Sequence, residues 1–239
     1  MPEPLQPTSN PPRQAAASAA PGTDDYAYGH PIDAIVLAGT HQNPKRLIRG
    51  SNKGLLEIAG APLVRHVARA LSAARQVDRI YVVGPAEELR PALAGLGRVV
   101  CVPQEGKMVA NSWAGVRAAE RPYHALPEEQ RNARPLLFIS CDLPLIVPGA
   151  IDDFIWRSAA TDQQDGRENA LVVGAAEEAG LAPFYGDGDE PGIERPLVQL
   201  HEGRMRLANI YVGRPRRLAH TEFLQTSFNL RKAKDWRNV

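Results

Sequence analysis

Short apolar runs alternate with segments of helical spacing along the chain, and this alternation restricts the fold more than any other feature. The apolar runs, rich in β-branched residues, occupy 32–39, 79–84, 99–102 and 136–141. Segments with helical spacing begin at Pro62 and cover 87–96, 108–119 and 151–158. Because parallel strands need long crossover connections, which helices usually supply, the pattern predicts α/β architecture. We expect a single three-layer α/β/α domain with a mostly parallel, Rossmann-like sheet and a ligand at the carboxyl ends of its strands.

The two ends of the chain differ from this pattern. Residues 1–30 contain six prolines and few large aliphatic side chains, which predicts a disordered leader, and the domain is expected over 31–239. Further short strands are expected at 170–174 and 206–212, followed by a polar, basic helical tail. The segment 180–192 is rich in Gly, Asp and Pro without helical spacing, which predicts a mobile loop or lid.

Composition narrows the range of partners. The formal net charge is +1, from 28 Lys and Arg against 27 Asp and Glu, so no global field favours nucleic acid or an anionic membrane. No apolar stretch is long enough to span a membrane, and no signal-peptide core is present. The cysteines, Cys101 and Cys141, lie in apolar runs that predict buried strands, which favours core positions and a cytoplasmic location. Oligomeric state stays open.

A basic loop follows the first apolar run. It leads from Leu37-Ala38-Gly39 to Asn52-Lys53-Gly54 and contains Lys45, Arg46 and Arg49. Backbone N–H groups and cations at the mouth of a sheet suit a triphosphate. An ordinary solvated loop explains the same spacing equally well.

Asp142 follows the fourth apolar run and precedes Pro144. A carboxylate at a strand end suits Mg²⁺, which prefers oxygen ligands and shares them with substrate phosphates. A turn or helix-capping residue accounts for Asp142 equally well when it is considered alone.

The segments Ile35–Gly39 and Lys53–Leu63 together resemble the opening signature of the MobA-like NTP transferases. The resemblance implies the nucleotide-diphospho-sugar transferase type of fold, a phosphate-contacting role for Lys53 and a magnesium-binding role for Asp142. Where the family has a glycine-rich loop with an arginine, this chain has Gly39-Thr40-His41-Gln42-Asn43-Pro44, and either Arg46 or Arg49 stands in for the arginine. An inactive relative is therefore one reading of this loop.

The resemblance extends to later segments. Gly106 and Asn111 match a segment that holds base and ribose, although helix capping explains them nearly as well. Asn209 lies where relatives carry a second metal or acceptor ligand, with Asp187 and Asp189 as alternatives. The expected nucleotide-binding residues are Leu37, Ala38, Gly39, Thr40, Arg46, Lys53, Gly106 and Asn111.

Taken together, the resemblance implies an Mg²⁺-dependent nucleotidyltransferase. It would move a nucleoside monophosphate from an NTP to a phosphorylated small-molecule acceptor and release pyrophosphate. Lys53 and Asp142 are the expected catalytic residues, and Asp142 and Asn209 the expected metal ligands. The alternatives are a glycosyltransferase that uses a nucleotide-sugar and a non-catalytic nucleotide-binding relative.

Overall fold

The computed structural model describes residues 25–39, 52–186, 192 and 197–219. Most of the expected leader, the loop residues Thr40, Arg46 and Arg49, the acidic residues Asp187 and Asp189, and the end of the basic tail lie outside the described residues. At the end of the expected leader, Ala27 and Tyr28 pack against the hydrophobic core.

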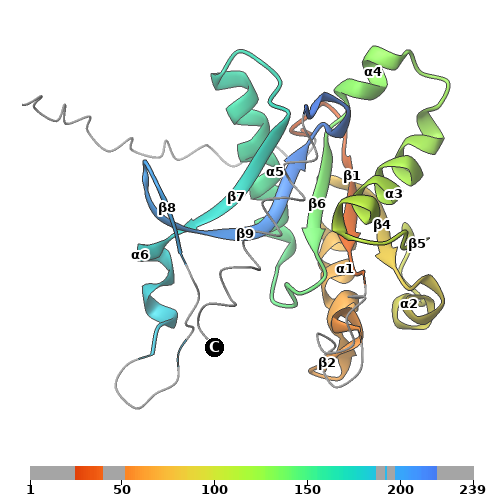
Figure 1. Ribbon diagram of the computed structural model, residues 1–239, viewed down its shortest axis with the longest axis horizontal. Helices are drawn as coiled ribbons and strands as arrows, with labels where there is room; N and C mark the ends of the chain where they lie inside the picture. Colours follow the sequence, from red (N-terminus) through yellow and green to blue (C-terminus); the bar gives the residue numbers. More distant parts are fainter. Residues whose placement is uncertain (1–24, 40–51, 187–191, 193–196, 220–239) are drawn as a thin grey trace, which may run out of the picture.

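A seven-stranded sheet forms the middle layer, with the strand order β5-β4-β1-β6-β9-β7 and β8 paired to β9 (Figure 1). Its strands are β1 Ile32–Leu37, β4 Val77–Gly84, β5 Val99–Pro103, β6 Leu136–Ser140, β7 Leu171–Glu177, β8 Val198–Leu200 and β9 Gly203–Gly213. β5, β4, β1 and β6 are parallel neighbours, whereas β9 runs antiparallel to both β6 and β7. The expected mostly parallel sheet is confirmed.

Helices cover both faces of the sheet. α1 Leu63–Ala73, α2 Ala86–Leu93 and α5 Pro148–Gln164 contribute to one core cluster, and α3 Met108–Glu120 contributes to the other. Successive residues of β1 point to opposite faces, so Ala34 and Val36 join the first cluster and Ile35 the second. This arrangement is the expected three-layer α/β/α fold.

Several short elements were not expected from the sequence. They are the hairpin of β2 Glu57–Ile58 and β3 Ala61–Pro62, the edge strand β8, and the helices α4 Glu128–Ala133 and α6 Glu178–Leu181. The expectation of a loop from residue 180 is wrong at its start, because α6 continues into a 3-10 helix over Ala182–Phe184. A helix this short has too few turns to show a period.

The two cysteines differ in their surroundings. Cys141 is buried just beyond β6, but Cys101 is only half-buried. The expectation of a fully buried Cys101 is wrong because β5 is an edge strand, with no strand on its other side among the described residues. Both thiols are free.

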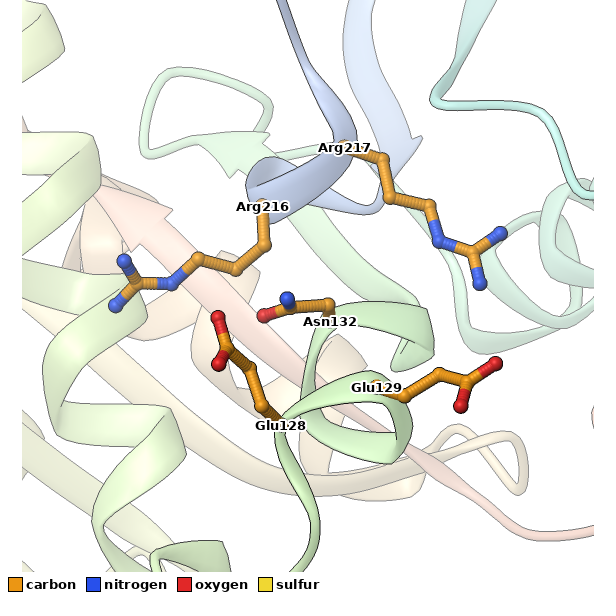
Figure 2. Close-up of a pocket in the computed structure, with 5 residues that line it drawn as sticks. All are labelled: Glu128, Glu129, Asn132, Arg216 and Arg217. Carbon is orange, nitrogen blue, oxygen red and sulfur yellow. The ribbon is translucent and has the colours of Figure 1, made fainter.

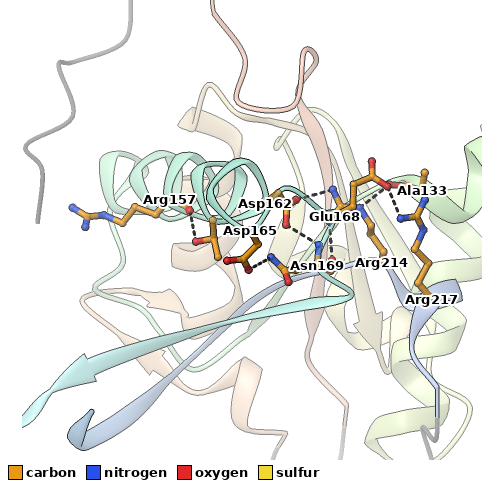
Figure 3. Close-up of polar contacts among 9 residues, drawn as sticks. Ala133, Arg157, Asp162, Asp165, Glu168, Asn169, Arg214 and Arg217 are labelled. Carbon is orange, nitrogen blue, oxygen red and sulfur yellow. Dashed lines mark hydrogen bonds and ion pairs between the residues drawn. The ribbon is translucent and has the colours of Figure 1, made fainter. Parts of the chain in front are cut away.

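A buried arginine joins several elements at the amino-terminal end of β6. Arg214, directly after β9, donates hydrogen bonds to the carbonyls of Ala133 and Asn169 at 3.0 and 2.8 Å, and to Asp162 Oδ2 at 2.9 Å (Figure 3). The Arg214 and Asp162 side chains are 3% and 10% exposed. Arg214 therefore ties the chain after β9 to α4, to α5 and to the segment before β7.

Candidate active site

The carboxyl ends of β1 and β6 lie side by side at the centre of the sheet. Leu37 aligns with Ser140 in the parallel ladder, and the Cys141 N–H donates to the Leu37 carbonyl at 3.2 Å. Gly39 and Asp142 therefore leave the sheet from neighbouring positions. Parallel sheets commonly bind their ligands at this edge.

Lys53 and Asp142 form an ion pair at this edge. The Lys53 ammonium contacts Asp142 Oδ2, and the Ser140 hydroxyl donates to Asp142 Oδ1. Burial opposes ionisation of Asp142, but the hydrogen bonds from Lys53 and Ser140 outweigh it and hold the pKa of the carboxyl below its ordinary value. The two residues expected to act together are thus brought together, with a carboxylate that is ionised at neutral pH.

Asn111 organises the loop on the other side of Gly39. Its Oδ1 accepts hydrogen bonds from the N–H groups of Glu105 and Gly106 at 2.8 and 3.1 Å, and its Nδ2 donates to the Gly106 carbonyl at 3.1 Å. A Cβ on Gly39 would lie 2.5 Å from Asn111 Nδ2, so only glycine fits there without a shift. The Asn111 side chain is buried, and its observed partners are backbone groups of the loop.

Asn209 lies in β9 with a backbone φ of 55°, in the left-handed region. β9 bulges here, because Tyr211 and Leu207 pair with Val173 and Ala175 of β7, leaving extra residues on β9. The ladder with β6 ends at the pair Ile139–Ile210. Asn209 and Ser140 each lie one residue beyond this last pair, and Ser140 is two residues before Asp142.

One hollow in the described structure lies away from these strand ends. It has a volume of about 450 Å³ and is lined by residues of α4 and of the chain after β9, namely Glu128, Glu129, Asn132, Arg216 and Arg217 (Figure 2). Since α4 precedes β6, this hollow is at the amino-terminal end of the strands. Arg216 and Arg217 are already paired with Glu120 and Glu168. The carboxyl ends of β1 and β6, where Lys53 and Asp142 lie, are therefore the better candidate for the active site.

The sequence prediction omitted two side chains of the site. Ser140 supports the Asp142 carboxylate, and Asn52 holds the turn that carries Lys53. Both are close in sequence to the residues they support, and that proximity was the available signal. Within the described ranges, no group of three or more His, Cys, Asp or Glu side chains could hold a metal ion, and no helix there is long and apolar enough to cross a bilayer.

Known proteins resemble this chain in part. A segment of 64 residues is 41% identical to a 2-C-methyl-D-erythritol 4-phosphate cytidylyltransferase of Rubrobacter xylanophilus, covering 27% of this chain and 26% of that protein. The chain therefore matches about a quarter of that relative's length. A solved structure of a hypothetical transferase from Thermus thermophilus superimposes with a TM-score of 0.52 at 24% identity, over 77% of this chain and 65% of the other. It shows that the fold is shared.

A family model also matches most of the chain. The model of the MobA-like NTP transferase domain covers residues 34–210, which include most of β1, Lys53, Asp142 and Asn209. The chain belongs to the MobA-like NTP transferase family.

Proposed function

We propose that this protein transfers a nucleoside monophosphate from an NTP to a phosphorylated small-molecule acceptor and releases pyrophosphate. The observation that carries the proposal is the Lys53–Asp142 pair at the joined ends of β1 and β6, in a chain of an NTP transferase family. The relative with the matching segment is named a cytidylyltransferase, which makes CTP the first nucleotide to test.

The residues at this edge fit a magnesium ion. Asp142 offers an ionised carboxylate, and Asn209 lies in β9 one residue beyond the last pair with β6, the strand that leads to Asp142. Mg²⁺ is commonly bound by one or two protein oxygens together with substrate phosphates. When bound, Mg²⁺ would neutralise charge on the phosphates and orient them. We propose Asp142 and Asn209 as its ligands.

Lys53 would supply the second positive charge. Its side chain is about half exposed and its ammonium already lies at the strand ends, so it can move from Asp142 to a nucleotide phosphate. An oxygen of the acceptor phosphate attacks the α-phosphorus and forms a new P–O bond. The bond from the α-phosphorus to the pyrophosphate oxygen breaks. The acceptor phosphate is ionised near neutral pH, so the protein acts by positioning and by electrostatic stabilisation.

The main experiment measures pyrophosphate release from CTP, UTP, GTP and ATP. Each nucleotide is supplied with Mg²⁺ and a panel of phosphosugar, phosphoalcohol and pterin phosphate acceptors, and products are identified by mass. We expect pyrophosphate with at least one pair, and a product that carries both the nucleoside monophosphate and the acceptor. Nucleoside diphosphate release from a nucleotide-sugar would instead favour a glycosyltransferase, and NTP binding without turnover would favour a non-catalytic relative.

A charge-removing variant tests the site itself. Lys53→Met is expected to lower kcat/KM by about 100- to 1000-fold, the usual effect of losing one group that stabilises developing charge. Arg157→Met is the matched control, because Arg157 also pairs with a carboxylate, Asp153 at 2.7 Å, but on the exposed surface of α5. Equal losses in the two variants would contradict the assignment of Lys53.

A further inference from the structure

Asn52 is a buried carboxamide directly before Lys53. It is 4% exposed, its Nδ2 donates to the Ala38 carbonyl at 2.8 Å, and its Oδ1 accepts the Gly54 N–H at 2.6 Å. One side chain thus connects the end of β1 to the turn that carries Lys53.

Both anchors of Asn52 are themselves fixed. The Ala38 N–H donates to the Val83 carbonyl of β4 at 2.8 Å, so Ala38 continues the central ladder. Gly54 packs closely against the residue before Asp142, since a Cβ on Gly54 would lie 3.4 Å from Cys141 Sγ. The residues on either side of Lys53 are therefore held against β1 and against the end of β6.

The Lys53 side chain has little other restraint. It is 51% exposed, and among the described residues its hydrogen-bond partner is Asp142. A long exposed lysine side chain loses rotamer entropy when it is held in one place. A fixed backbone at Lys53 reduces the number of conformations in which the ammonium misses Asp142.

We propose that Asn52 is a positioning residue, which holds the backbone of Lys53 so that the ammonium reaches the strand ends. Its effect on turnover rests on the proposed function, whereas its effect on the Lys53–Asp142 pair does not. Asn52 contacts backbone groups and acts through Lys53.

Gln76 provides a matched control. It is another carboxamide that is 4% exposed, and it also bridges two backbone groups, accepting from the Ala27 N–H at 2.9 Å and donating to the Asp25 carbonyl at 3.3 Å. Gln76 precedes β4 and lies at the amino-terminal end of the sheet. Gln76→Ala therefore removes comparable bonds far from Lys53.

The first test observes Lys53 without requiring activity. The chain has only five lysines, so reductive ¹³C-methylation gives few NMR signals, and Lys53→Arg identifies that of Lys53. We expect this signal to stand apart in the wild type and to move toward the free-lysine position in both Asn52→Ala and Asp142→Asn. Gln76→Ala should leave it unchanged. An unmoved Lys53 signal in a folded Asn52→Ala protein overturns the proposal.

A second variant, Asn52→Asp, keeps the test possible if Asn52→Ala does not fold. Asn52→Asp keeps an acceptor for the Gly54 N–H and loses the donor to the Ala38 carbonyl. We expect its Lys53 signal to lie between the wild-type position and the free-lysine position. If Asn52→Ala does not fold, an Asn52→Asp signal identical to that of the wild type overturns the proposal.

The kinetic test asks whether Asn52 acts through Lys53. Asn52→Ala is expected to lower kcat by about 10- to 100-fold, a range typical of small misplacements. In the Lys53→Met background the same substitution should have almost no further effect, because coupled residues are not additive. Full additivity overturns the proposal. A wild type that releases no pyrophosphate refutes only the proposed function, since the NMR test still decides the role of Asn52.

Discussion

Replacement of Arg214 should destabilise the protein strongly, even though it lies at the end of the sheet opposite Lys53. Arg214→Met preserves most of the side-chain volume but removes hydrogen bonds to two carbonyls and to Asp162 (Figure 3). Asp162 is only 10% exposed and would keep its bond from the Asn169 N–H. Breaking such a buried pair costs about 3–5 kcal/mol. At about 2–4 °C per kcal/mol for a domain of this size, the thermal midpoint should fall by about 6–20 °C.

Thermal and urea denaturation measure this change, with Arg157→Met as the control. The exposed Arg157–Asp153 pair on α5 is expected to contribute less than about 1 kcal/mol. Adding Asp162→Asn to Arg214→Met should recover part of the loss, because it removes the unpaired buried charge and keeps an acceptor for the Asn169 N–H. If Arg214→Met and Arg157→Met lower the free energy of unfolding equally, the stabilising role assigned to Arg214 is wrong.

Two further predictions concern Asn209 and Asp33. Asn209→Gly and Asn209→Ala should lower turnover to a similar extent because both lack the amide. Only alanine should lower the thermal midpoint, since glycine and asparagine tolerate a left-handed φ that costs other residues about 1–2 kcal/mol. Unchanged turnover in Asn209→Gly would exclude the amide from the site. Burial raises the pKa of Asp33 above its ordinary value of 3.8, so the folded protein binds a proton at Asp33 more tightly than the unfolded chain does. The free energy of unfolding therefore falls as pH rises from the ordinary pKa of Asp33 to its raised pKa in the folded protein. Urea denaturation from about pH 4 upward should therefore show the free energy of unfolding of Asp33→Asn rising relative to that of the wild type. A difference between the two proteins that does not change with pH would contradict the raised pKa of Asp33.

The core of the fold could be predicted because its signals are local. The runs at 32–39 and 136–141 are apolar and bounded by turn residues, and they form the neighbouring strands β1 and β6. The spacing of apolar residues after Pro62 gives α1, with Val64, Val67 and Leu71 buried on one face. Such periodicity reports which face of each element is covered.

Elements that form by pairing with residues far away in the sequence are harder to predict from local sequence patterns. β8 is three residues long and its residues are exposed, so it is too short to show a clear alternating pattern, and it forms by pairing with β9. The half-buried state of Cys101 follows from the place of β5 at the sheet edge, which strand order alone determines. Topology of this kind is not encoded in local periodicity.

In the candidate site, too, local motifs predict some residues, whereas the contacts between them depend on the fold. Lys53 and Asp142 could be predicted as site residues from the resemblance of their motifs to the family, but their ion pair depends on β1 and β6 being neighbours. The bulge in β9 at Asn209 depends on the pairing of β9 with β7, and the position of Asn209 beside the end of β6 depends on the pairing of β9 with β6. The supporting side chains Asn52 and Ser140 act on backbone and carboxylate groups that only the fold brings into reach.

The central claim is that nucleotidyl transfer takes place at Asp142. The most direct measurement compares pyrophosphate release by the wild type and by Asp142→Ala, with Mg²⁺ and the best NTP and acceptor from the panel. We expect release by the wild type and a loss of at least about 100-fold in the variant, because the phosphates then lack the carboxylate that would hold their metal ion. Equal turnover in two equally folded proteins would contradict the assignment of the site.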